Sequence, residues 1–109
     1  MFTFIKALGG NIGNSLVEED LLDVAKDTVN NAVKAGVNLM IPLDTVAADK
    51  FADDAEKQVC KAESIPDGWM GLDIGRETII WYKDLIENSA TILWNGPMGV
   101  FEMPSFEEG

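Results

Sequence analysis

The chain has 109 residues, with 8 Lys and Arg against 19 Asp and Glu and no His, so its formal net charge at pH 7 is −11. This acidity disfavours nucleic-acid binding, because affinity for the phosphate backbone comes largely from clustered Lys and Arg, and it equally disfavours docking on anionic membranes. Without His, these residues contain no His general base, no His metal ligand and no Ser-His-Asp or Cys-His pair.

The composition is that of a folded chain in a reducing compartment. Hydrophobic residues make up 47% of the sequence and the mean hydropathy is +0.04, whereas disordered acidic chains are poor in apolar residues. No apolar run approaches the ~18–20 residues of a membrane span, and the first residues lack the basic region and cleavage site of a signal peptide. Cys60 is the only cysteine, which excludes an internal disulfide and a Cys-based zinc site and suits the cytoplasm.

The first predicted elements lie before residue 44. Residues 2–8 are apolar but too short to assign to a helix or a strand. Ser15 precedes Glu18 by three residues, the spacing of a capping box, and apolar residues at helical intervals follow as far as Gly36, a candidate C-cap. Residues 37–43 read as a buried strand, because the run VNLMIPL is apolar and its proline stands near the end.

The middle of the chain is more polar. Residues 44–62 are polar and Ala-rich, and a helical turn is expected near residues 50–55. Residues 65–75 open with a Pro-Asp-Gly turn that runs into a short apolar stretch. Apolar residues at helical spacing then predict a helix over residues 76–86.

The last segments complete an alternation of strands and helices. Residues 91–95 read as a second buried strand, and a helix is possible from Pro104 or Ser105. Alternation favours an α/β layer with a parallel sheet, but parallel strands are buried on both faces, and the predicted helices are too few to cover them. The chain also stops at Gly109 with no closing element. We therefore expect a piece of a larger domain.

Two glycine-containing segments are candidates for ligand binding, because ligands of open α/β sheets bind beyond the carboxyl ends of the strands. They are residues 68–73 and 95–102. Asn95 offers an amide donor to a phosphate oxygen, and Glu102 offers an acceptor to ribose hydroxyls. The apolar walls of a slot for a planar base would come from Met70, Leu72, Val100 and Phe101.

The same residues have simpler interpretations that spacing alone leaves open. Gly-Pro and Pro-Asp-Gly clusters are usually plain turns, the apolar residues suit a core, and Glu102 suits a solvated position. Asp44 and Asp73 could face a magnesium ion, although a cap or turn role is the better interpretation. Cys60 lacks a His or second Cys to make it catalytic. Neither a GxxxxGK-Ser/Thr nor a GxGxxG motif occurs, so the nucleotide hypothesis from spacing is weak.

Longer motifs carry more information than spacing. IPDGWMGLDIG (residues 65–75) followed by TILWNGPMGVFE (residues 91–102) resembles phosphoglycerate kinase. SLVEEDLLDVAK (residues 15–26) and LMIPLDTVAADKF (residues 39–51) resemble the same family in the same order, so the likeness covers essentially the whole chain. One departure is Arg76, where the family commonly has proline, which changes the start of the following helix.

The resemblance implies a monomeric, cytoplasmic enzyme of two α/β domains joined by a hinge. It implies that residues 1–109 are an interior segment of the C-terminal, nucleotide-binding domain, a three-layer parallel-sheet fold, with no complete second domain. The expected reaction is reversible phosphoryl transfer between 1,3-bisphosphoglycerate and ADP, giving 3-phosphoglycerate and ATP in glycolysis. The phosphoglycerate would bind the absent N-terminal domain.

Matched residue by residue, the resemblance also implies nucleotide contacts within this chain. The adenine slot is implied to be lined by Met70, Gly71, Leu72 and Phe51. The opposite wall of the base site is implied to come from Gly99, Val100 and Phe101. The loop at Asn95 and Gly96 is implied to approach the phosphates, and Glu102 to bind the ribose.

Other parts of the family's machinery fall outside the chain. The Gly-Gly-Gly-Asp-Thr segment that holds metal and phosphate would follow Gly109, and the lysines that contact the phosphates would precede Met1. We therefore expect no catalytic residue here, Mg²⁺ entering as MgATP or MgADP with its ligands outside the segment, and an inactive isolated chain. A stand-alone nucleotide-binding module and a non-functional truncation product are the alternatives.

Overall fold

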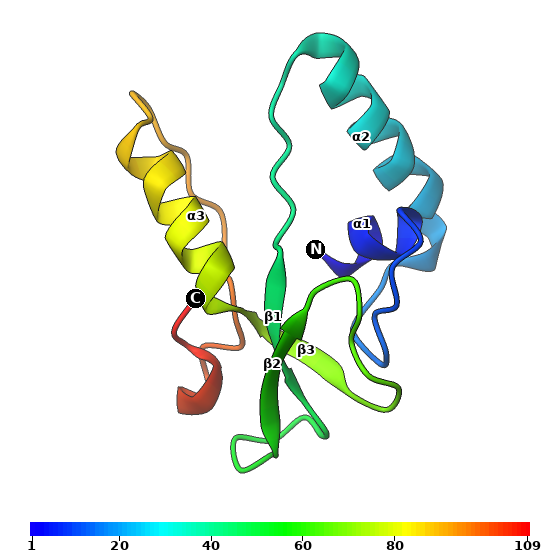
Figure 1. The fold of residues 1–109 in the computed structure, drawn as a ribbon, viewed down its shortest axis with the longest axis vertical. Helices are drawn as coiled ribbons and strands as arrows, with labels where there is room; N and C mark the ends of the chain where they lie inside the picture. Colours follow the sequence, from blue (N-terminus) through cyan, green and yellow to red (C-terminus); the bar gives the residue numbers. More distant parts are fainter.

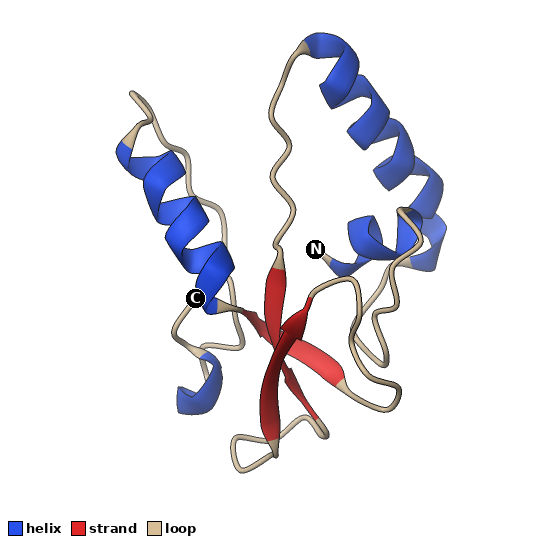
Figure 2. Ribbon diagram, viewed as in Figure 1, coloured by secondary structure: helices blue, strands red, loops and turns tan.

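A computed structural model describes all residues 1–109 as a small antiparallel sheet flanked by helices (Figure 1). In chain order the elements are α1 (Phe2–Ala7), α2 (Leu22–Ala35), β1 (Asp44–Ala48), β2 (Lys57–Lys61), β3 (Met70–Ile74) and α3 (Arg76–Glu87), with 3₁₀ turns at Glu19–Leu21 and Pro104–Phe106. Helices α1 and α2 lie together on one side of the sheet and α3 on the other (Figure 2). The α/β class expected from the sequence is therefore confirmed. None of the helices is both long enough and apolar enough to cross a membrane.

The sheet has the strand order β2-β1-β3, and both pairings are antiparallel. The expectation of a parallel sheet is thus wrong for the strands that form. Strands β1 and β2 are joined by the short turn of residues 49–56, and a parallel pair would need a crossover of a dozen residues or more. Strand β3 contains an irregularity: Val46 pairs with Asp73 and Ala47 with Gly71, so Leu72 lies opposite no residue of β1.

The helix predictions are largely confirmed. The helix expected over residues 76–86 forms as α3, and residues 2–7, which the sequence left open between helix and strand, form α1. Gly36 ends α2 in the left-handed conformation with φ 69°, as a C-cap glycine does. The predicted capping box is wrong, however, because α2 begins only at Leu22 and the Ser15 hydroxyl accepts a hydrogen bond from the Gly71 backbone N–H at 2.9 Å instead.

The two strands predicted at residues 37–43 and 91–95 are absent. Both segments run without regular structure, and Leu39 is 41% and Leu93 90% exposed. A strand is stabilised by the strand beside it, and no strand of these 109 residues pairs with either segment. Strands β1 and β2 form instead within residues 44–62. The helical turn expected near residues 50–55 does not form, and residues 49–55 are bends and turns between the two strands.

Two small apolar clusters form the core. In the first cluster, Ile5 of α1 packs against Ile12 and Ala62. In the second, Phe106 of the C-terminal segment packs against Ala48 and Leu72 of the sheet. Phe106 is completely buried. The C-terminal loop is thereby packed against the sheet near β3.

A buried polar cluster joins β1 to the start of α3. The Asp44 carboxylate accepts hydrogen bonds from the backbone N–H groups of Glu77 and Thr78 at 3.0 and 2.9 Å, and from the Thr78 hydroxyl at 2.6 Å. Free N–H groups of a first helical turn attract a carboxylate in this way. Asp44 is therefore a structural cap, as the simpler interpretation of the sequence expected.

Candidate ligand-binding pocket

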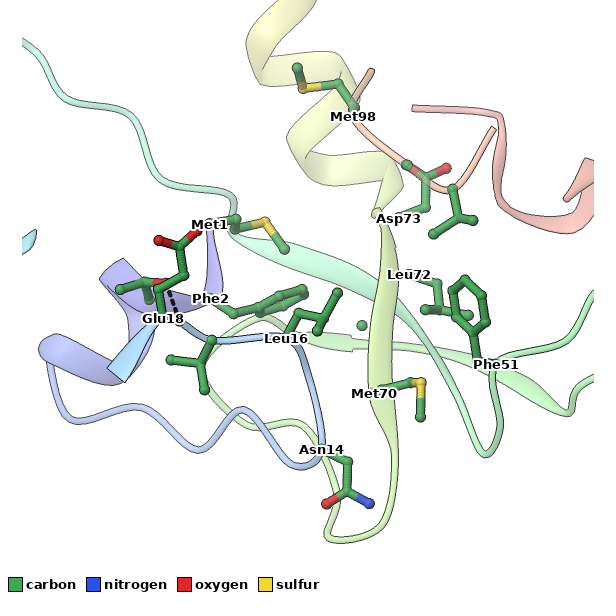
Figure 3. Close-up of a pocket in the computed structure, with 15 residues that line it drawn as sticks. Met1, Phe2, Asn14, Leu16, Glu18, Phe51, Met70, Leu72, Asp73 and Met98 are labelled. Atoms are coloured by element: carbon green, nitrogen blue, oxygen red, sulfur yellow. Dashed lines mark hydrogen bonds between the residues drawn. The ribbon is translucent and has the colours of Figure 1, made fainter. Parts of the chain in front are cut away.

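An open pocket of about 780 Å³ lies between the N-terminal segment, β3 and the loop that follows α3 (Figure 3). Its volume is within the range of about 300–1,000 Å³ that is usual for pockets that hold small organic molecules. Most lining residues are hydrophobic, and the full set is Met1, Phe2, Thr3, Asn14, Leu16, Val17, Glu18, Phe51, Met70, Gly71, Leu72, Asp73, Met98, Gly99 and Val100.

Strand β3 forms one wall of this pocket. A Cβ atom at Gly71 would overlap the Phe2 ring and lie 2.8 Å from the Thr45 Oγ1, so glycine is what allows α1 and β1 to approach the strand closely. The Gly71 N–H donates to Ser15, and the Thr45 hydroxyl donates to the Asp73 carbonyl at 2.6 Å. The wall is therefore held by side chains from two other parts of the chain.

A second wall comes from the loop after α3. The Val100 N–H donates to the Leu72 carbonyl at 3.0 Å, and the Met103 N–H donates back to the Val100 carbonyl at 2.9 Å. Because β3 is an edge strand, its outer carbonyls are open to this loop. Phe106 then packs on Leu72 and Ala48, which fixes the loop a second time.

The charged groups of the pocket are acidic. Asp73 is only 2% exposed and accepts hydrogen bonds from the backbone N–H groups of Ile74 at 2.8 Å and of Gly109 at 3.0 Å. Burial raises the pKa of the Asp73 carboxyl above its ordinary value; the two hydrogen bonds oppose this rise and the charge of Glu108 adds to it. Glu18 is the other acidic lining residue, and no Lys or Arg lines the cavity.

The pocket brings together six of the residues singled out from the sequence. They come from the turn after β1, from β3 and from the C-terminal loop: Phe51, Met70, Gly71, Leu72, Gly99 and Val100. Four others are exposed and do not line it, namely Asn95, Gly96, Phe101 and Glu102. The segment that carries Asn95 forms no strand here, so nothing orients that amide toward the cavity.

Sequence reasoning missed the wall formed by the N-terminal residues. Phe2, Leu16 and Val17 line the cavity, although no local pattern links residues 1–18 to β3. Asp73, for which the sequence leaves a magnesium-facing role and a cap or turn role open, lies buried at the pocket wall, and its carboxylate accepts hydrogen bonds from two backbone N–H groups. No group of three or more His, Cys, Asp or Glu side chains is arranged to hold a metal ion.

The fold and the pocket together define an α/β protein with a mostly apolar pocket whose volume suits a small organic molecule. The family model described as phosphoglycerate kinase matches residues 1–109. The chain therefore belongs to the phosphoglycerate kinase family.

Individual relatives agree with this assignment. Phosphoglycerate kinase of Deinococcus radiodurans is 58% identical over 109 residues, which are 100% of this chain and 26% of the relative. Phosphoglycerate kinase 3, cytosolic, of Arabidopsis thaliana is 52% identical over the same length, or 27% of that protein. The structure of phosphoglycerate kinase from Coxiella burnetii superimposes with a TM-score of 0.95 at 37% identity, covering 98% of this chain and 28% of that one. The chain thus spans about a quarter of the length of these proteins.

Proposed function

We propose that this chain is a segment of the C-terminal, nucleotide-binding domain of a phosphoglycerate kinase. The proposed reaction is reversible phosphoryl transfer between 1,3-bisphosphoglycerate and ADP, giving 3-phosphoglycerate and ATP. The observation that carries the proposal is the mostly apolar pocket, whose lining includes Met70–Leu72 of β3 and Gly99–Val100 of the C-terminal loop. Membership of the family over the whole chain supports it.

The segment would bind and orient the adenosine part of the nucleotide. Apolar walls on both sides bury a planar base and exclude water from it. Glu102, two residues after the lining residue Val100, would accept hydrogen bonds from the ribose hydroxyls.

The phosphoryl group would react outside this cavity. Transfer requires positive charge around the phosphates, and no Lys or Arg lines the pocket. Mg²⁺ would neutralise phosphate charge as part of MgADP or MgATP, and the described residues offer no three-ligand cluster of their own to hold it. We therefore propose that the metal and phosphate ligands, and the phosphoglycerate site of an N-terminal domain, lie in other parts of a cytoplasmic, monomeric kinase.

The test is the replacement of Glu102 by Ala in the full-length kinase that contains this segment. A lost hydrogen bond to a charged group corresponds to about 10- to 150-fold in affinity, so the KM for ADP should rise by at least about tenfold. The KM for phosphoglycerate should stay within about twofold, because that ligand would occupy the other domain. Glu107→Ala is the matched control, since Glu107 is also an exposed carboxylate of the C-terminal segment. Equal losses for both ligands would show that Glu102 is structural.

A stand-alone nucleotide-binding module is the second candidate, because residues of this chain alone line an open, mostly apolar pocket. Calorimetric titration of ADP into the purified 109-residue chain separates the candidates. Micromolar binding would support the module, and no binding would support a segment that works only within the kinase. In either case we expect no turnover in a coupled kinase assay, and turnover by the isolated chain would contradict the proposed division of roles.

A further inference from the structure

The C-terminal loop is attached to β3 through two consecutive residues. Leu72 accepts a hydrogen bond from the Val100 N–H through its carbonyl, near the beginning of the loop. Asp73 accepts one from the Gly109 N–H through Oδ2, at the other end. A Cβ atom at Gly99 would overlap the Asp73 carboxylate, so this side chain contacts both ends of residues 99–109. The position of the loop against the pocket therefore depends on Asp73.

The surroundings of Asp73 differ from those of the other buried aspartate. Asp44 binds the first turn of α3 and thereby joins two elements of the fold. Asp73 binds only its neighbour Ile74 and the distant Gly109, and it lines the cavity. Burial of a carboxylate is costly, and a neutral side chain would fill the same space at lower cost. The hydrogen bonds that the Asp73 carboxylate accepts from two backbone N–H groups explain why a charged side chain occupies this position.

We propose that Asp73 is a positioning residue for nucleotide binding. It holds residues 99–109 on β3 and so sets the position of the lining residues Gly99 and Val100 against the lining residues of β3. The inference rests on the proposed function, since the ligand whose position is set is the nucleotide.

The test is the Asp73→Asn variant of the full-length kinase, which keeps the shape of the side chain. An amide oxygen can accept from only one of the two N–H groups, and the amide NH₂ faces the other. Loss of one hydrogen bond to a carboxylate predicts a KM for ADP raised by about tenfold, with kcat within about twofold of the wild-type value. The thermal midpoint should change little, because removal of a buried charge offsets the lost bond.

The pH profile gives a second measurement that a purely structural role would not affect. Burial raises the pKa of the Asp73 carboxyl, and Glu108 is the charged group that acts on it. As the pH falls toward that raised pKa, protonated Asp73 comes to resemble asparagine. The difference in KM between wild type and Asp73→Asn should therefore shrink at low pH.

Asp44→Asn is the matched control. This variant should lower the thermal midpoint, because Asp44 caps α3, and it should leave the KM for ADP unchanged. The inference is overturned if Asp73→Asn leaves the KM for ADP within about twofold, or if its thermal midpoint, kcat and KM for phosphoglycerate all worsen together. If the wild-type kinase shows no saturable use of ADP, the proposed function fails instead.

Discussion

Replacement of Thr78 by Val should strongly destabilise the domain that contains this segment. Thr78 is completely buried, and its hydroxyl lies at the junction of β1 and α3. It donates to the Asp44 carboxylate at 2.6 Å and accepts from the N–H groups of Leu43 at 3.0 Å and Asp44 at 3.2 Å. Valine has nearly the same shape but can make none of these bonds.

The size of the loss in the free energy of unfolding depends on whether each hydrogen-bond partner of the Thr78 hydroxyl can find another partner. The Asp44 N–H is buried and would lose this acceptor, at a cost of about 1–3 kcal/mol. The Asp44 carboxylate keeps its bonds to the Glu77 and Thr78 N–H groups but loses one donor, about 1.5 kcal/mol or more. Leu43 is exposed, so its N–H can bind water at little cost. The expected loss in the free energy of unfolding is about 2–4 kcal/mol.

Urea unfolding of the full-length kinase, followed by circular dichroism, measures this loss. With a slope near 2 kcal/mol/M, the midpoint of the domain should fall by about 1 to 2 M. Thr28→Val is the control: its hydroxyl donates to the Val24 carbonyl on the exposed side of α2, and the change should cost less than about 0.5 kcal/mol. A Thr78→Val midpoint equal to that of Thr28→Val would refute the reasoning.

Two further predictions concern the pocket and the single thiol. Gly71→Ala would place a Cβ atom against the Phe2 ring, and the overpacking should lower the free energy of unfolding by about 1–3 kcal/mol; an unchanged urea midpoint would contradict this. Burial, and then the charge of Asp44, raise the pKa of the half-buried Cys60 thiol above its ordinary value. Since the thiolate is the nucleophile, alkylation of Cys60 followed by peptide mass spectrometry should require higher pH than alkylation of free cysteine, and Asp44→Asn should move the profile back toward it.

Locally encoded features of the fold could be predicted from the sequence. The periodicity of residues 76–86 and the glycine at position 36 act within one or two helical turns, and both appear as expected. The same local reasoning was wrong for Ser15, because its hydroxyl is used by Gly71, 56 residues away, and not by the helix beside it. A capping motif predicts a cap only when no distant partner competes for the side chain.

Strand predictions failed for a related reason. Residues 37–43 and 91–95 are apolar enough for buried strands, but a strand forms only where another strand lies beside it, and these 109 residues place none there. Residues 44–61 are less apolar and still form two strands, because a short turn brings them together. Apolar content indicates which segments can be buried, but it does not indicate which segments pair as strands.

The sequence by itself determined the α/β class, the positions of two helices and the family, and six of the ten residues that it singled out line the pocket. These features are carried by contiguous patterns and motifs. Only the tertiary structure decided the antiparallel order of the strands, the wall formed by Phe2 and Leu16, and the buried contacts of Asp73 with Gly109. Each of these depends on which distant segments pack together, and that choice is made by the packing and hydrogen bonding of the whole chain rather than by any local pattern.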